Sequence, residues 1–487
     1  MIEIQLSEDD FQYDVYTLVK AFFPEEEVRV SVGAEDESVE NNRLLQVQYS
    51  QKNVRIILKD QTGVLSDRTA EFQSCERKSK KNKLKRLLYE QLSEAAGRQL
   101  PWGNLTGIRP VKIVMSMLEQ GKERQEVECS VMETYCMSRE KAELSLNIAE
   151  RELSVLSTFP YREGYSLYVG IPFCPTTCLY CSFTSYPIIS WREHTKEYLA
   201  ALYKELEYIA QRMKKKRLDS VYIGGGTPTT LSAKELMELL SFIREKFDLS
   251  SVKEFCVEAG RPDSITKEKL TVLKQCGVER ISINPQTMNE KTLRVIGRQH
   301  SVADIVRAFE LAQAVGFRTI NMDIILGLPG EELKDLEHTM EEIKKLSPQN
   351  LTVHSLALKR AARLNIQKTL FAEKINAAPQ KMMIMASEYA KTMEQFPYYL
   401  YRQKNMGGNL ENVGYAKEGH IGLYNILIME EKQTIMAAGA GAMTKNVLKN
   451  GDIIRVENVK DVANYMNRVD EMIARKEEVF VSHEREL

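Results

Sequence analysis

The sequence lacks a long hydrophobic run. No stretch of about 18 consecutive apolar residues occurs along the chain, so no transmembrane helix is expected. The first residues, MIEIQLSEDD, contain neither the basic segment nor the apolar segment of a secretory leader. We therefore expect a soluble, cytoplasmic protein without a membrane span.

An excess of either charge is also missing. The chain has 67 Lys and Arg against 68 Asp and Glu, a formal net charge of −1. A balanced chain has no overall field that attracts nucleic acid. The one basic stretch, residues 77–86 (RKSKKNKLKR), runs into LLYEQLSEAAG and is interpreted as the solvated start of a helix. No nucleic-acid partner is expected.

Cysteine is scarce as well. Eight cysteines in 487 residues are too few for a disulfide scaffold. Five of them are scattered, and we expect these to be reduced and buried. The other three, Cys174, Cys178 and Cys181, lie within the octapeptide CPTTCLYC. This octapeptide is the first candidate site.

Six short apolar runs alternate with amphipathic segments from residue 165 onward. The alternation predicts a parallel sheet whose strands are covered on both faces, as in a barrel. Its strands are SLYVGIPF, DSVYIGGG, EFCVEA, RISINPQ, TINMDIILGLPG and LTVHSLAL, and its helices are 193–213, 232–246, 266–275, 302–315 and 332–346. The predicted fold is therefore α/β, a partial parallel (β/α)6 barrel. In barrels of this kind the chemistry lies at the carboxyl ends of the strands.

Length and pattern divide the chain into three predicted domains. Residues 1–160 form an α+β domain of unknown role, 161–365 form the barrel, and 366–487 form a separate C-terminal α+β lobe on the substrate side. The first domain contains a predicted hairpin, Leu44–Tyr49 with Val54–Leu58, and helices between 111 and 155. The lobe contains a helix at 379–395, the Tyr-rich segment PYYLYRQKNM and a hairpin-like stretch at 424–442.

The three clustered cysteines follow the spacing CxxxCxxC directly after the first predicted strand. They are one ligand short of a closed structural zinc site, but they suit a 4Fe-4S cluster with one iron left open. The open iron can bind S-adenosylmethionine (SAM), whose reductive cleavage gives a 5′-deoxyadenosyl radical. Zinc binding or a chance match remains the alternative for the spacing alone. Tyr180 before the third cysteine, the strand before the loop and the βα repeat after it favour the cluster.

This region resembles the radical SAM superfamily and, within it, the oxygen-independent coproporphyrinogen III oxidase family. The resemblance covers roughly residues 165–445 and rests on LYVGIPFCPTTCLYCSF, GGGTPT, VEAGRPD, INPQ, IGRQH and NMDIILGLPG. It implies an oxidoreductase that uses SAM and a 4Fe-4S cluster. The metal ligands and catalytic residues are expected to be Cys174, Cys178 and Cys181.

The resemblance also implies SAM-binding roles for residues at successive strand ends. Gln286 and Asp323 are expected to bond the ribose hydroxyls, and Arg298 the methionine carboxylate. Glu258 is expected to hold the amino group, which the bare backbone of the GGGTPT loop approaches. Tight packing of strand against helix is the alternative explanation for these glycines. The other residues expected at SAM are Tyr168, Tyr180, Gly225, Gly226 and Thr227.

The C-terminal segment is most similar to the coproporphyrinogen dehydrogenase (Z-type) branch. The implied reaction converts two propionates of coproporphyrinogen III to the vinyl groups of protoporphyrinogen IX, in anaerobic haem biosynthesis. The implied partners are this tetrapyrrole and a low-potential electron donor such as flavodoxin or ferredoxin. Arg402 and Lys404 in the Tyr-rich segment could bind substrate carboxylates, or the segment could serve only for packing.

Three positions depart from the family pattern. Gly170 stands where the family signature has histidine, and Phe183 stands where the best-known oxidases have a fourth cysteine, as in the haem-chaperone branch. Residues 424–429 replace the chaperone's HNxxYW pattern, and His420 is the nearest histidine. Two alternatives therefore stay open, a haem-binding chaperone and a radical SAM enzyme that acts on another tetrapyrrole.

Overall fold

The structure, a computed structural model, describes residues 1–33, 43–72, 76–107, 109–181, 185–357, 379–403 and 410–483. It comprises two compact units. The first is Met1–Glu150 with Tyr401–Glu411, and the second is Arg151–Leu400 with Asn412–Leu487. Within the described ranges, no helix has both the length and the apolar character needed to cross a membrane.

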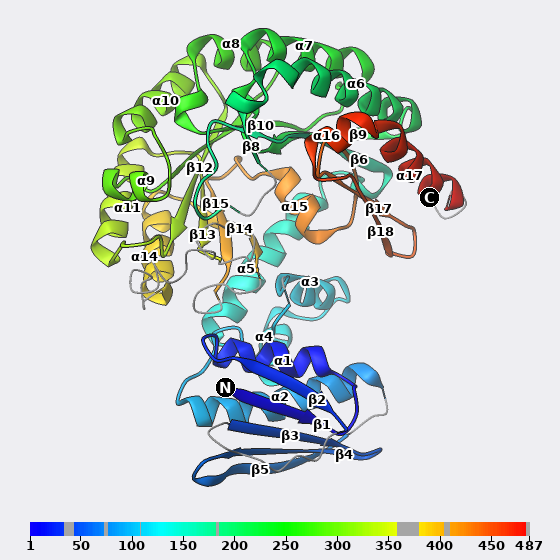
Figure 1. The fold of residues 1–487 in the computed structure, drawn as a ribbon, viewed down its shortest axis with the longest axis vertical. Coiled ribbons are helices and arrows are strands. Elements are labelled where there is room, and N and C mark those ends of the chain that lie inside the picture. Colours follow the sequence, from blue (N-terminus) through cyan, green and yellow to red (C-terminus); the bar gives the residue numbers. More distant parts are fainter. Residues whose placement is uncertain are drawn as a thin grey trace. The chain divides into compact units, whose positions relative to one another are not determined.

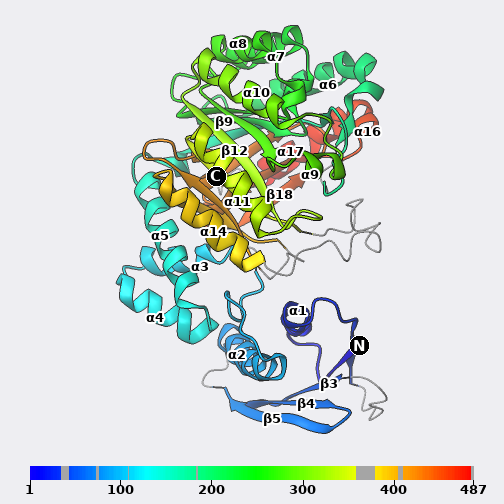
Figure 2. The same ribbon diagram turned by 90° about the vertical axis from the view of Figure 1, so that its left-hand side faces the viewer.

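The first unit contains a five-stranded sheet in the order β2-β1-β3-β4-β5. Its strands are β1 (Ile2–Leu6), β2 (Val28–Val32), β3 (Arg43–Tyr49), β4 (Asn53–Asp60) and β5 (Gly63–Glu71). Strands β3 and β4 are the predicted hairpin, with Tyr49 opposite Val54. Helices α1 (Gln12–Phe22) and α2 (Arg77–Ala96) cover one face of this sheet (Figures 1 and 2). The remaining helices are α3 (Val111–Glu119), α4 (Arg124–Tyr135) and α5 (Arg139–Leu156), the last of which continues into the second unit.

All six predicted strands of the barrel form in the second unit, and they lie side by side in sequence order. They are β6 (Gly164–Ile171), β9 (Arg217–Gly225), β10 (Glu254–Gly260), β11 (Arg280–Gln286), β12 (Thr319–Leu326) and β13 (Asn350–Ser355). Neighbouring pairs are parallel throughout. Most of their residues are buried, as the continuous apolar runs predicted.

Helices line the outer side of these six strands in an arc (Figure 1). They are α6 (Thr195–Arg212), α7 (Ala233–Lys246), α8 (Lys267–Gln275), α10 (Val302–Val315) and α11 (Leu333–Leu346), with the short α9 (Glu290–Val295) between β11 and α10. Ser232 with Glu235 and Ser301 with Asp304 form capping boxes that start α7 and α10. The predicted helices therefore form close to their expected limits.

The residues expected to form a separate C-terminal lobe instead extend the barrel sheet at both edges. Strands β15 (Asn412–Ala416) and β14 (Phe396–Tyr401) continue it beyond β13, and β16 (Thr434–Ala438), β17 (Met443–Val447) and β18 (Ile453–Glu457) continue it beyond β6. An open sheet leaves unpaired backbone groups at each edge, and these strands pair with them. The predicted boundary at residues 365 and 366 lies outside the described residues.

The stretch 424–442 is not a hairpin. It forms helix α15 (Leu423–Glu430) and then β16, which pairs with β6 in parallel. The helix α14 (Pro379–Thr392) ends a few residues before its predicted limit, and α16 (Val462–Asn467) and α17 (Val469–Ser482) pack against α6. Hydrophobic periodicity in the sequence cannot distinguish a short buried helix from a buried strand, because both are apolar along their whole length.

Candidate active site

The loop that carries the three cysteines starts at the carboxyl end of β6. The chain leaves β6 through β7 (Phe173–Cys174), and the loop is then bound by a neighbouring segment. The Leu179 backbone N–H donates to the Ile296 carbonyl at 3.0 Å, and Thr176 Oγ1 donates to the Gly297 carbonyl at 3.1 Å. The segment after α9 therefore holds the middle of the cysteine loop.

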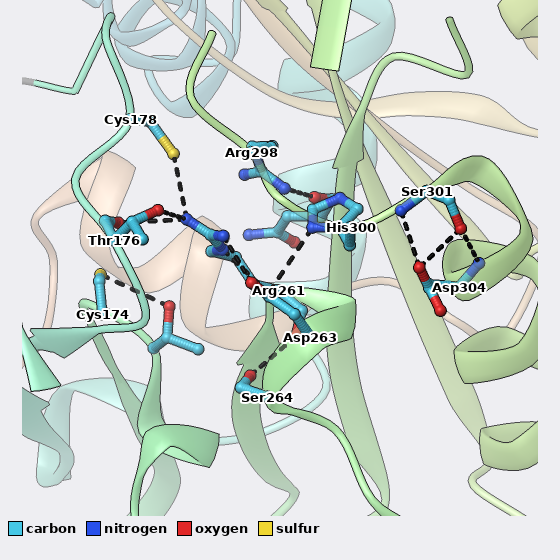
Figure 3. Close-up of polar contacts among 12 residues, drawn as sticks. Cys174, Thr176, Cys178, Arg261, Asp263, Ser264, Arg298, His300, Ser301 and Asp304 are labelled. Atoms are coloured by element: carbon cyan, nitrogen blue, oxygen red, sulfur yellow. Dashed lines mark hydrogen bonds and ion pairs between the residues drawn. The ribbon is translucent and has the colours of Figure 1, made fainter. Parts of the chain in front are cut away.

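Polar groups from two further strand ends reach the thiols. Thr227 Oγ1, after β9, lies 3.5 Å from Cys174 Sγ. Arg261 Nη1, after β10, lies 3.9 Å from Cys178 Sγ (Figure 3). Among the described residues, no three side chains of His, Cys, Asp or Glu converge on a single metal ion. A cluster does not need such convergence, because each thiolate binds a different iron atom.

The glycines of the GGGTPT loop are explained by close packing. A Cβ atom on Gly226 would lie 2.6 Å from the Phe173 carbonyl oxygen and 2.9 Å from that of Ile171. The Gly226 backbone N–H donates to the Ile171 carbonyl at 2.8 Å, and the Thr227 backbone N–H donates to the Phe173 carbonyl at 2.7 Å. Gly225 has φ of +108°, which disfavours any side chain. This packing fixes the loop against the start of the cysteine segment.

Glu258 lies at the end of β10 beside this glycine loop. Its Oε1 accepts a 2.5 Å hydrogen bond from the Tyr222 hydroxyl, and its Oε2 accepts one from the Gly225 backbone N–H at 3.2 Å. The pKa of Glu258 is raised to about 7. Burial is the largest cause, the Tyr222 hydrogen bond acts in the opposite direction, and the Asp323 charge adds to the increase. A nearby cation would reverse this effect, because it favours the charged carboxylate.

Gln286 ends β11, and Arg298, in the segment after α9, contacts the cysteine loop. Gln286 adopts the left-handed φ of +70°, is 7% exposed, and its Oε1 is buried without a hydrogen-bond partner among the described residues. Arg298 donates to the Tyr180 hydroxyl at 3.1 Å and to the Asn284 carbonyl. Strain and an unpaired buried oxygen in one residue are costly unless a ligand uses them.

Asp323 lies on β12, the strand that pairs with β11. Asn321 Nδ2 donates to its Oδ1 at 2.7 Å, and His354 Nε2 lies 3.6 Å from its Oδ2. The side chains of Asp323 and His354 are 18% and 25% exposed, so both are accessible from the solvent side. The structure thus places Asp323 within β12, three residues before its carboxyl end, with one partner on each oxygen.

Three stacked tyrosines adjoin Glu258 through the Tyr222 hydroxyl. The rings of Tyr222 and Tyr424 are 4.4 Å apart, and Tyr168 lies 6.2 Å from Tyr222 and 6.4 Å from Tyr424. Tyr168 was expected near SAM, whereas Tyr222 and Tyr424 were not singled out from the sequence. In the sequence, Tyr222 is one residue of the apolar run that forms β9, so nothing there distinguishes it from its neighbours. Only its hydrogen bond to Glu258 in the structure connects it to the site.

The departures from the family pattern have partial structural explanations. Gly170 lies on β6 opposite β16, and a Cβ there would lie 3.3 Å from the Ala438 carbonyl oxygen. Residues 424–429 belong to the buried helix α15. His420 Nδ1 bonds Thr319 Oγ1 at the amino end of β12, away from the cysteines. Phe183 lies outside the described residues.

The Tyr-rich segment does not present Arg402 as an exposed cation. Arg402 is 4% exposed, donates to the Leu105 carbonyl at 2.7 Å, and lies 5.6 Å over the Trp102 ring, all within the first unit. Tyr398 and Tyr399 are buried as well. The packing alternative therefore accounts for these three residues, while Lys404 lies outside the described ones.

The comparisons with known proteins agree with this geometry. The family model of the radical SAM superfamily matches residues 168–343. The oxygen-independent coproporphyrinogen-III oxidase-like protein HemZ of Bacillus subtilis is 39% identical over 413 residues, covering 83% of this chain and 82% of HemZ. The chain belongs to the radical SAM superfamily and to its coproporphyrinogen-III oxidase-like family. Membership implies a 4Fe-4S cluster and SAM.

Two other relatives of this radical SAM protein differ in their stated roles. The haem chaperone HemW of Bacillus subtilis is 33% identical over 315 residues, covering 63% of this chain and 76% of HemW. The structure of the Escherichia coli coproporphyrinogen III oxidase HemN, a radical SAM enzyme, has a TM-score of 0.51 at 22% identity, covering 66% of this chain and 72% of HemN. The likeness to HemN shows the α/β radical SAM fold alone.

The raised pKa of Glu258 predicts a pH-dependent stability. The folded protein holds the Glu258 proton up to about pH 7, whereas the unfolded chain releases it near 4.5. Stability from this group is therefore greatest below pH 4.5 and is lost as the pH rises through 7, by about 2 to 3 kcal/mol between pH 5 and pH 8. Denaturant unfolding of the apoprotein at several pH values measures this loss.

Two substitutions control this prediction. Glu258→Gln should remove the loss, because it has no proton to release. Tyr222→Phe should enlarge it, because the Tyr222 hydrogen bond lowers the pKa of Glu258. Parallel pH profiles for the original chain and Glu258→Gln would contradict the assignment.

Proposed function

We propose that the protein is an oxygen-independent coproporphyrinogen III oxidase that converts two propionates of its substrate to vinyl groups. The observation that supports this most is the convergence of two strand ends, those of β9 and β10, and of the segment after α9 on the cysteine loop, in a chain 39% identical to HemZ. The name of HemZ refers to coproporphyrinogen III, but it describes that relative and not this chain. The tetrapyrrole is therefore a proposal for this chain.

The residues around the loop fit the two cofactors. Cys174, Cys178 and Cys181 would bind the cluster as thiolates. Gln286 and Asp323 would bond the ribose hydroxyls of SAM, and the buried unpartnered Oε1 of Gln286 gives one hydroxyl an acceptor. The other residues assigned to SAM are Tyr168, Tyr180, Gly225, Gly226, Thr227, Glu258 and Arg298.

Two charged residues of opposite sign suit the methionine part of SAM. Arg298 would pair with the carboxylate, and its guanidinium is already oriented by Asn284 and Tyr180. Glu258 would hold the amino group, whose positive charge favours the ionised carboxylate. The Gly225 N–H and the Tyr222 hydroxyl keep that carboxylate in place.

When bound, the cluster and SAM would supply a 5′-deoxyadenosyl radical, a species able to remove one hydrogen atom from the β-carbon of a propionate. The proposed product would then require the loss of carbon dioxide and of one electron to an acceptor. A low-potential donor such as flavodoxin or ferredoxin would supply the electron for SAM cleavage. The residues assigned to SAM would hold it in one orientation.

A haem chaperone is the second candidate, because HemW is 33% identical over 63% of this chain. Transfer of haem needs an accessible ligand, and in HemW-like sequences the HNxxYW pattern supplies a histidine. Here the matching residues form the buried α15, and the His420 ring bonds Thr319 at the opposite strand ends. These contacts favour the oxidase.

An anaerobic assay of the reconstituted protein with SAM, a reductant and coproporphyrinogen III tests the proposal. Vinyl product together with 5′-deoxyadenosine would support the oxidase. Tight haem binding without turnover would replace it with the chaperone. Methyl transfer to haem, or haem opening, would establish a radical enzyme for another tetrapyrrole.

Loss of a ribose contact is expected to weaken SAM binding without loss of iron. Asp323→Ala and Gln286→Ala should each raise the Kd for SAM by about tenfold, because one charged or buried hydrogen bond is worth roughly 1.5 kcal/mol. Calorimetry with the cluster-loaded protein measures Kd, and iron analysis is the control. Asp248→Ala, at an exposed loop position, should match the original chain. Loss of iron in Asp323→Ala would mean a structural role.

A further inference from the structure

Arg261 is the one described residue that joins the cysteine loop to β10 through both backbone and thiol. It follows Glu258 by three residues and is 3% exposed. Asp263 neutralises it through two bonds, Nε to Oδ1 at 3.0 Å and Nη2 to Oδ2 at 2.6 Å. This arrangement leaves Nη1 directed at the loop (Figure 3).

Nη1 makes three contacts with the loop. It donates to the Thr176 hydroxyl at 2.6 Å and to the Thr176 carbonyl at 3.2 Å, and it lies 3.9 Å from Cys178 Sγ. One nitrogen therefore fixes the segment between the first and second cysteines. A lysine could not replace it, because only the planar guanidinium can bond Asp263 and the loop simultaneously in this geometry.

Asp263 is itself held from a second side. His300 Nδ1 lies 3.6 Å from Asp263 Oδ1, and the His300 side chain is 1% exposed. His300 comes two residues after Arg298, in the segment that bonds Tyr180. The pair Arg261 and Asp263 thus lies between the cysteine loop and the IGRQH segment.

We propose that Arg261 is a positioning residue for the cluster, which holds Thr176 and Cys178 in place and raises the reduction potential of the cluster, because the guanidinium end of its ion pair with Asp263 is the end that contacts Cys178. The proposal rests on the proposed function in that it requires the cluster. Reduction adds one negative charge to the cluster and its thiolates. A buried cation near Cys178 stabilises the reduced state more than the oxidised state, and hydrogen bonds to cluster sulfur act in the same direction.

Two substitutions separate the charge from the anchoring. Arg261→Gln keeps an N–H donor and removes the charge, whereas Arg261→Ala removes both. Arg244→Gln is the matched control, because Arg244 also donates to a backbone carbonyl, that of Cys276, but lies on α7 away from the cysteines. The full-length protein is used in each case.

Two measurements follow. A redox titration of the reconstituted protein without SAM, monitored by electron paramagnetic resonance, gives the midpoint potential. Hydrogen exchange of the apoprotein reports on the Leu179 and Cys181 amides, which donate to the Ile296 and Cys178 carbonyls. Arg261→Gln should retain its iron and show a more negative potential. Arg261→Ala should lose iron and exchange these amides more than about tenfold faster, through local opening of the loop.

The outcomes distinguish this proposal from the proposed function. An unchanged potential in Arg261→Gln, or unchanged exchange in Arg261→Ala, would overturn the role of Arg261. Changes of equal size in Arg244→Gln would overturn it too, because they would show a general effect on the fold. Failure of the original chain to bind iron and sulfide would overturn the proposed function, while the exchange experiment would still test the anchoring.

Discussion

Replacing Cys174, Cys178 or Cys181 by alanine should reduce bound iron from about four atoms per chain to nearly none. The brown chromophore at about 400 nm should disappear in the same three variants. Each thiolate binds a separate iron atom, so the loss of one cysteine leaves one iron atom without its protein ligand. Two cysteines are too few to hold a cluster against loss to solvent.

The control for this experiment is Cys276→Ala. Cys276 is also a buried free thiol, 5% exposed, but it ends α8 on the outer side of the sheet. The Cys276→Ala variant should bind as much iron as the original chain. Iron retained at full level in all three loop variants would remove the cluster assignment and everything built on it.

Gly226→Ala is expected to have the second largest effect. The new Cβ would lie within 3 Å of three backbone atoms, the Phe173 and Ile171 carbonyl oxygens and the Pro172 carbonyl carbon. Backbone cannot move aside as a side chain can, so the hydrogen bonds of Gly226 and Thr227 to this segment should break. Such overpacking typically costs about 1 to 3 kcal/mol.

The consequence should be local to the site. We expect an iron content at least about fivefold lower and no measurable SAM binding, since displacement of the loop moves Thr227 away from Cys174, whereas far-ultraviolet circular dichroism should keep its shape. Gly107→Ala is the control, because a Cβ there has no atom within 4 Å and its φ lies outside the left-handed region. Normal SAM affinity in Gly226→Ala would show that the close packing is not required.

The sequence predicted the barrel well because its strands are local patterns. Each is a short apolar run, and each helix between them has the 3.6-residue period and a start signal such as Ser301. The same reasoning failed for residues 424–442, where a helix and a strand have equally apolar sequences. It also could not show that β16 pairs with β6, since that pairing joins residues some 270 positions apart.

The candidate site was predictable only in part. The spacing of Cys174, Cys178 and Cys181 carries its own chemical meaning, and resemblance supplied Glu258, Gln286, Arg298 and Asp323. Arg261 was missed although it lies within the same VEAGRPD segment as Glu258. Nothing in its neighbours along the chain indicates that its guanidinium reaches Thr176, 85 positions away.

By itself, the sequence determined the three thiols, the order of strands and helices in the barrel, and the polar residues on or after its strands. Those features depend on residue type and on spacing along the chain. Only the tertiary structure decided that the C-terminal strands extend the sheet at both edges, that a Cβ on Gly226 would lie too close to the backbone of residues 171–173, and that Arg402 is buried. It also decided that Arg261 holds the cysteine loop. The physical reason is that these four features depend on contacts between segments far apart in the sequence. Such contacts form only when the folded chain brings the segments together.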